Sequence, residues 1–165
     1  MAEIKKIYRQ TMNPSRFIGK RYTTKVCVDF GETWLEWIEK EWFDQLAALA
    51  RGRMKEVYED GDAFIALMRE KDGCLEYWIG YFMPPDIVAP EGYQSMDFPK
   101  CELGTAWVYG MGDDVLMKED LSWKSMISEG YKLNDEWCIE RYVCPRFTTP
   151  DEKGNVILDM CFFIE

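Results

Sequence analysis

"EWCIERYVC", residues 136–144, decides the fold because "LEYWIGYFM", residues 75–83, echoes it in the first half of the chain. Both stretches are typical of β-strands, and each belongs to a half that reads strand, strand, helix, strand, strand. We therefore predict an α+β fold in which two similar strand-helix-two-strand modules pack pseudo-symmetrically. The chain would be one domain, residues 1–165, with halves at about 1–85 and 90–165. The alternative is a single meandering α+β sheet.

The predicted elements follow from hydrophobic spacing and turn residues. Strands are predicted at about 4–12, 16–24, 62–69, 76–83, 93–98, 101–110, 136–146 and 156–164. Residues 33–52 predict one long helix with a core stripe of Leu35, Ile38, Trp42, Leu46 and Leu49. Trp37 lies off this stripe, so it either walls a cleft or rests against a neighbouring strand. A second helix is predicted over residues 118–130, ending at Gly130.

Composition excludes several classes of function. The 165 residues carry a net charge of −10, whereas a duplex-binding surface is normally basic, so we expect no direct contact with nucleic acid. The chain has no histidine, which excludes Ser-His-Asp and Cys-His catalysis and any His-ligated metal. The six cysteines, Cys27 among them, form no CxxC pair and indicate free thiols. We expect no metal and no cofactor, and any general base must be Asp, Glu, Lys, Cys or Tyr.

Targeting signals are missing from the sequence. No apolar run approaches the roughly 18–20 residues of a membrane span, and the first residues contain no apolar signal core. We therefore expect a soluble cytoplasmic protein without a membrane partner.

Glu140 is the most unusual residue in the predicted strand over residues 136–144. A carboxylate within an apolar strand is costly to desolvate unless it is paired or neutralised. Either Glu140 pairs with Arg141, Arg146 or a lysine on a solvated edge, or it lies in a pocket. Alternation in the neighbouring strand puts Trp107 and Tyr109 on one side. If this side and Glu140 line a cleft between the modules, the site would bind flat aromatic or cationic molecules. The default role of each aromatic residue is core packing.

Several segments, taken in order, resemble the GyrI-like small-molecule-binding family, which also supplies the effector-binding half of AraC- and MerR-type multidrug regulators. The resemblance covers about residues 62–165 and is carried by "YWIGYFM", "APEGYQSMDFPKCELGTAWVYGMG", "SWKSMISEGYKL", "CIERY" and "VILDMCFFIE". It implies a duplicated fold with a ligand cleft between the halves and the motif glutamate, Glu140, pointing into it. The final strand lacks the proline usual in the family.

Three functions compete. The first is a stand-alone protein that binds aromatic or cationic drug-like molecules through Glu140, Trp107, Tyr109, Tyr142, Trp78 and Trp37. The second, which some family members perform, is hydrolysis of cyclopropane-bearing genotoxic compounds. Glu140 would then activate water, and Tyr109 or Tyr142 would stabilise the oxygen that gains charge. The third is an interaction module with a protein partner, such as a gyrase-binding inhibitor. A homodimer is compatible with all three.

Overall fold

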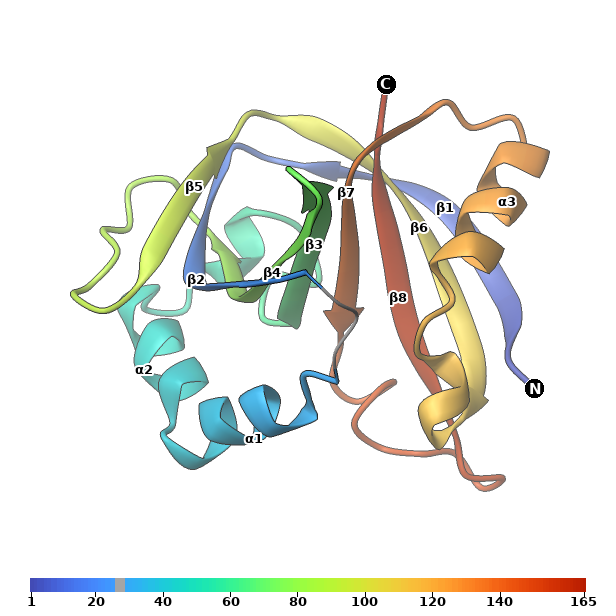
Figure 1. The fold of residues 1–165 in the computed structure, drawn as a ribbon, viewed down its shortest axis with the longest axis horizontal. Helices are drawn as coiled ribbons and strands as arrows, with labels where there is room; N and C mark the ends of the chain where they lie inside the picture. The colour runs from blue at the N-terminus through green and yellow to red at the C-terminus, as the bar shows by residue number, and fades with distance from the viewer. Residues whose placement is uncertain (26–28) are drawn as a thin grey trace. The chain divides into compact units, whose positions relative to one another are not determined.

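The computed structural model describes residues 1–25 and 29–165, which form eight strands, three α-helices and two short 3-10 helices (Figure 1). The α+β class is therefore confirmed. The chain divides into two compact units, which are described separately: unit 1 is Met1–Thr11 with Cys101–Glu165, and unit 2 is Met12–Lys100.

Each unit contains four strands with their own helices. Unit 1 has the strand order β1-β6-β8-β7 and comprises β1 (Glu3–Met12), β6 (Cys101–Met111), η2 (Gly112–Val115), α3 (Glu119–Ser128), β7 (Leu133–Tyr142) and β8 (Asn155–Ile164). Unit 2 has the order β3-β4-β2-β5 and comprises β2 (Ser15–Thr24), α1 (Gly31–Glu39), α2 (Trp42–Leu49), η1 (Met54–Glu56), β3 (Phe64–Lys71), β4 (Cys74–Met83) and β5 (Gln94–Phe98). Both units therefore combine segments of the two expected halves, because β1 joins unit 1 and β5 joins unit 2.

Strand register sorts the side chains of unit 1 onto two faces. β8 pairs antiparallel with both β6 and β7, and Met160 stands opposite Ala106 and Glu140. The next residue of β8, Asp159, stands opposite Trp107 and Arg141. Paired residues point to the same face and successive residues to opposite faces. The row of Glu140 and the row of Trp107 therefore lie on opposite sides of the sheet.

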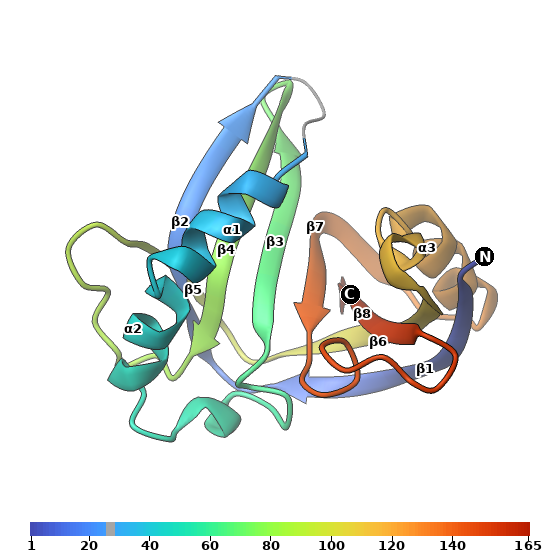
Figure 2. The ribbon, with the colours of Figure 1, turned by 90° about the horizontal axis from the view of Figure 1, so that it is seen from below.

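We call the side that carries Met160 the helix face, because α3 and η2 pack on it. Met126 of α3 clusters there with Ala106 and Phe162, and Val115 of η2 clusters with Val108, Leu158 and Met160. Figure 2 shows α3 on one side of the unit 1 strands. The opposite side, with Trp107, Arg141 and Asp159, we call the network face.

The predicted long helix is two helices. The left-handed conformation of Glu41, with φ of 56°, separates α1 from α2 and changes the helical phase. The predicted core stripe is therefore wrong for Leu35 and Ile38, which are 53% and 62% exposed, whereas Trp37 is 0% exposed. Beyond the break, Leu46 is buried as predicted, but Leu49 is 37% exposed, so the predicted stripe is wrong there too. The second predicted helix is confirmed as α3, and Gly130 follows its end with φ of 92°.

Aromatic side chains build the core of unit 2. Phe43 of α2 lies 4.3 Å from the ring of Phe64 and 5.6 Å from that of Tyr81, so the helices are held to one face of the sheet. At the centre of that sheet, Gly19 of β2 pairs with Gly80 of β4. A Cβ atom on Gly19 would come within 2.0 Å of the Ile79 carbonyl oxygen, so this close approach requires glycine.

Candidate functional site

Glu140 lies on the helix face of unit 1, near the end of β7, and only 7% of its surface is exposed. Tyr142 lies two residues further along β7, so its side chain is on the same face as that of Glu140. The Tyr142 hydroxyl donates to Oε2 of Glu140 over 3.0 Å. Within the described part of the chain, no lysine or arginine forms an ion pair with this carboxylate, and Oε1 accepts no hydrogen bond.

The surroundings of Glu140 are apolar. Cys138 and Tyr142, its neighbours along the same face, pack with Phe147 against a buried cluster that includes Met160. The Tyr142 and Phe147 rings meet edge to face at 4.8 Å. This environment shields the carboxylate from water, and among the described residues no cation compensates its charge.

Burial changes the ionisation of Glu140. Desolvation, followed by the negative charge of Glu119, raises the pKa of Glu140 from 4.5 to about 7, and the hydrogen bond from Tyr142 opposes this rise. Burial also raises the pKa of the Cys138 thiol, and the charges of Glu119 and Glu140 add to that rise. Glu119, in the first turn of α3, therefore acts on both side chains across the helix face. The carboxyl group of Glu140 is poised to be protonated or charged near neutral pH.

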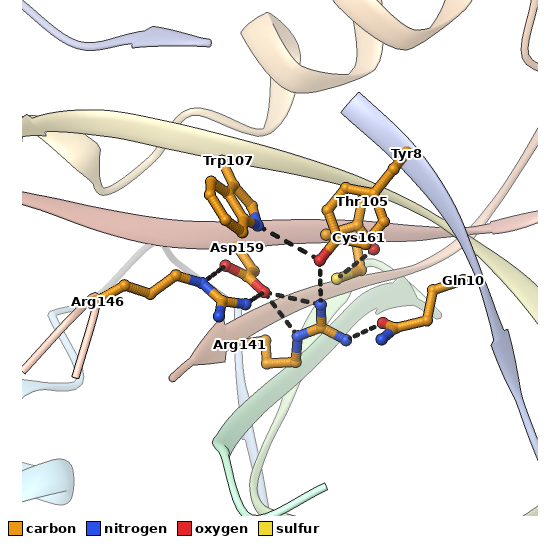
Figure 3. Close-up of polar contacts among 8 residues, drawn as sticks. All are labelled: Tyr8, Gln10, Thr105, Trp107, Arg141, Arg146, Asp159 and Cys161. Atoms are coloured by element: carbon orange, nitrogen blue, oxygen red, sulfur yellow. Dashed lines mark hydrogen bonds and ion pairs between the residues drawn. The ribbon is translucent and has the colours of Figure 1, made fainter. Parts of the chain in front are cut away.

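The network face carries a polar network that reaches all four strands of unit 1 (Figure 3). At its centre, buried Asp159 accepts from Arg141 Nε at 2.8 Å and from Arg146 Nε at 2.9 Å. Arg141 continues the network to β1, donating to Gln10 Oε1 at 2.6 Å and to the Tyr8 hydroxyl at 3.1 Å. The hypothesis that Glu140 pairs with Arg141 or Arg146 is therefore wrong, because both arginines bind Asp159 on the other face.

Trp107 and Tyr109 also lie on the network face, so the structure does not bring them to Glu140. The indole Nε1 of Trp107 donates to the Tyr8 hydroxyl over 3.3 Å, and the Arg146 guanidinium lies 4.7 Å from the indole ring. The Tyr109 hydroxyl donates to Asp151 Oδ2 over 2.5 Å and accepts from Asn155 Nδ2 over 2.9 Å. The expectation that these rings share one wall with Glu140 fails because strand register places them one residue out of phase.

Trp37 and Trp78, the other predicted ligand-binding residues, are core residues of unit 2. The Trp37 indole Nε1 donates to the Tyr22 hydroxyl of β2 at 3.0 Å. Of the two positions expected for Trp37, it therefore takes the one against a neighbouring strand. Trp78 lies edge to face with Phe17 at 5.9 Å, and its buried indole nitrogen has no hydrogen-bond partner among the described residues.

Two further charged residues interrupt apolar strands in the same way as Glu140 and were not among the predicted site residues. Asp159 interrupts the apolar stretch "VILDMCFFIE", and Glu76 interrupts "LEYWIGYFM". Both are buried and both are paired, Asp159 with two arginines and Glu76 with Arg21 and Arg69. An ionised residue in an apolar strand needs a partner. This rule singles out Asp159 and Glu76 from the sequence as readily as it singles out Glu140.

Other expectations concern metals, thiols and membranes. Among the described residues, no group of three or more Cys, Asp or Glu could hold a metal ion. The five described cysteines are free thiols, and Cys27 lies outside the described residues. No helix within the described ranges is long and apolar enough to span a membrane.

Comparison with known proteins identifies the fold through structure alone. No family and no curated protein matches the chain by sequence. SAV2435 bound to tetraphenylphosphonium superimposes with a TM-score of 0.69 at 13% identity, over 98% of this chain and 94% of that one. The C-terminal domain of EcmrR gives 0.61 at 13% identity, over 97% of each chain. The chain has a GyrI-like fold. A hydrolase from Listeria innocua has a similar fold, with a TM-score of 0.52 at 13% identity, over 98% of this chain and 92% of that one.

Proposed function

We propose that the protein binds small molecules, and that its ligands are aromatic cations whose charge is received by Glu140. One observation carries the proposal. Glu140 is a buried carboxylate without a cation among the described residues, while the adjacent arginines both serve Asp159. A carboxylate in an apolar setting is stabilised by any cation that reaches it. An aromatic body would suit the rings of Tyr142 and Phe147.

The structural neighbours support the proposal. SAV2435 holds tetraphenylphosphonium, a lipophilic aromatic cation, within the same fold. The second neighbour is the C-terminal domain of EcmrR. The EcmrR chain in a complex with DNA also contains a part that is similar in structure to this chain. We assign the ligand contacts to Glu140 and Tyr142. Trp107, Tyr109, Trp78 and Trp37 are occupied in the network face and in the core of unit 2.

The test is to titrate the protein with tetraphenylphosphonium at about pH 8 and to measure binding by calorimetry. We expect wild type to bind, and Glu140→Gln to bind at least tenfold more weakly. One tenfold step is roughly 1.4 kcal/mol, and Coulomb attraction in a partly desolvated site exceeds that. Glu136→Gln, an exposed change in the same strand, is the matched control and should bind like wild type. Equal binding by both variants and wild type would reject the assignment of Glu140.

A second function is favoured by one observation, the pKa of Glu140 near 7. Such a carboxylate can act as a general base at neutral pH. In hydrolysis of a cyclopropane-bearing compound, Glu140 would take a proton from water while the water oxygen bonds to a ring carbon. The strained carbon–carbon bond breaks, and its electron pair moves to an acceptor within the substrate, with Tyr142 nearby as a hydrogen-bond donor. Tyr109 is not brought to this carboxylate.

Mass spectrometry separates this function from binding alone. Wild type is incubated with a cyclopropane-bearing alkylator and the products are analysed for addition of water. A hydrolase should lose roughly 10²–10⁴-fold in turnover on Glu140→Gln, the usual effect of a positioned general base. Recovery of the unchanged compound from wild type would leave binding as the function.

A further inference from the structure

Ser122 is a buried hydroxyl group that nothing in the described structure satisfies. It lies in α3, it is fully buried, and its Oγ atom has no hydrogen-bond partner. Serine in a helix commonly donates to the carbonyl four residues earlier, as Ser125 does to Leu121 over 2.7 Å. Ser122 does not use this local solution, so its hydroxyl stays available to another group.

Two neighbours on α3 show where Ser122 points. Glu119 precedes it by three residues and Met126 follows it by four, so the three side chains share one side of the helix. Met126 packs on the helix face in a cluster to which Cys138 belongs, and Glu119 acts electrostatically on Cys138 and Glu140. Ser122 lies between them and therefore faces the part of β7 that carries Glu140.

The helix face thus holds two groups that can accept further hydrogen bonds, the Glu140 carboxylate and the Ser122 hydroxyl. Among the described residues, Tyr142 alone donates a side-chain hydrogen bond to this carboxylate, at Oε2. Ser122 Oγ neither donates nor accepts. A quaternary cation supplies charge but no N–H group, so it can donate to neither group. A protonated amine supplies charge and one to three N–H donors, and hydrogen bonds between charged groups are the stronger ones.

We propose that the site of Glu140 selects protonated primary and secondary amines, which carry at least two N–H donors, over quaternary cations, and that Ser122 contributes to this selectivity. The proposal rests on the proposed binding function and narrows its ligand class to protonated aromatic amines that carry at least two N–H donors. Glu140 supplies attraction for either kind of cation. Ser122 contributes only when the ligand can donate to it.

The experiment uses two probes with one body, protonated benzylamine, which has three N–H donors, and N,N,N-trimethylbenzylammonium, which has none. Both are titrated into the full chain at about pH 8, one unit above the pKa of Glu140, which is about 7. Wild type should bind the primary ammonium at least tenfold more tightly, because each charge-assisted hydrogen bond contributes about that much. Ser122→Ala should lose about tenfold of this preference by weakening binding of the primary ammonium alone. Ser125→Ala, whose hydroxyl bonds within its own helix, should keep it.

The outcomes separate the two proposals. Equal affinity of wild type for both probes, unchanged in Ser122→Ala, would overturn the selectivity and leave cation binding at Glu140 intact. Binding of neither probe would overturn both. Thermal unfolding shows whether Ser122→Ala is folded, and we expect it to be as stable as wild type, because it removes an unpartnered buried hydroxyl. If that variant fails to fold, Ser122→Cys replaces it, since a thiol is only a weak acceptor.

Discussion

Glu140 and Arg141 are adjacent in β7 and face opposite sides of the sheet. The Arg141 guanidinium binds Asp159 at 2.8 Å on the network face, while Glu140 remains on the helix face with the Tyr142 hydroxyl as its hydrogen-bond donor. β7 therefore directs Arg141 to the face that carries Asp159, and within the described residues no cation pairs with Glu140 on the other face. Most of the properties that can be tested follow from this separation.

The first prediction concerns stability and pH. Because burial raises the pKa of Glu140 from 4.5 to about 7, the folded protein holds this proton more tightly than the unfolded chain. The stabilisation is complete below about pH 4.5 and is lost as pH rises through 7, by roughly 3 kcal/mol in total. Glu140→Gln lacks this titration. Urea denaturation should show the variant gaining about that amount relative to wild type between about pH 4 and pH 8.

A difference in unfolding free energy that stays flat over this range would show that Glu140 ionises alike in both states. Glu136→Gln, an exposed change in the same strand, serves as the control.

The second prediction concerns binding and pH. Tetraphenylphosphonium carries a permanent charge, so only the protein titrates. With a pKa of about 7, Glu140 is mostly protonated at about pH 6 and mostly charged at about pH 8. The affinity should rise about tenfold between these values. Glu140→Gln should bind weakly and equally at both, and an unchanged pH dependence in that variant would assign the titration to another group.

The third prediction concerns the network face. Asp159→Asn would leave the buried Arg141 and the partly buried Arg146 without their shared carboxylate. We expect the free energy of unfolding to fall by about 3–5 kcal/mol, the usual effect of breaking a buried ion pair. Asp97→Asn is the matched control, because Asp97 binds Arg16 with its own side chain 65% exposed. Its loss should stay below about 1 kcal/mol. Similar losses in the two variants would contradict the prediction.

The fourth prediction concerns the break between α1 and α2. Trp37→Ala removes a fully buried ring and the hydrogen bond to Tyr22, and should reduce the unfolding free energy by about 3–5 kcal/mol. Ile38→Ala removes a side chain that is 62% exposed and should change it by at most about 0.5 kcal/mol. If residues 33–52 formed one uninterrupted helix with the predicted stripe, Ile38→Ala would lose more unfolding free energy than Trp37→Ala. Chemical denaturation of the two variants measures which loss is larger.

The fifth prediction concerns nucleic acid. With a net charge of −10, this chain alone should show no salt-sensitive shift of duplex DNA in a gel at physiological salt. A specific shift that weakens as salt rises would contradict the prediction.

Local patterns were enough to predict the strands and the class of the fold. Alternation and turn residues are properties of neighbours in sequence, and the stretch "CIERY" lies within β7 as expected. The same local logic singled out Glu140 as a carboxylate in an unfavourable position. It could equally have singled out Asp159, which interrupts β8 in the same way.

The break between the first two helices escaped prediction for a different reason. Residues 33–52 have helical spacing throughout, but Glu41 adopts a left-handed conformation that spacing does not reveal. That turn in the chain directs Trp37 into the core and Ile38 to the surface. Tertiary packing overrode the local pattern because burying a large ring outweighs the preference for one straight helix.

By itself, the sequence determined that Glu140 is a charged residue in a strand that has no room for one, and that the chain forms an α+β fold. Only the tertiary structure decided which residues share its face. Alternation sorts side chains within one strand, but the register between β7, β8 and β6 determines which of them meet. A shift by one residue exchanges the two faces, so Trp107 could stand with Glu140 or with Arg141. Pairing across β8 placed Trp107 with Arg141, and among the residues that the structure describes no cation pairs with Glu140.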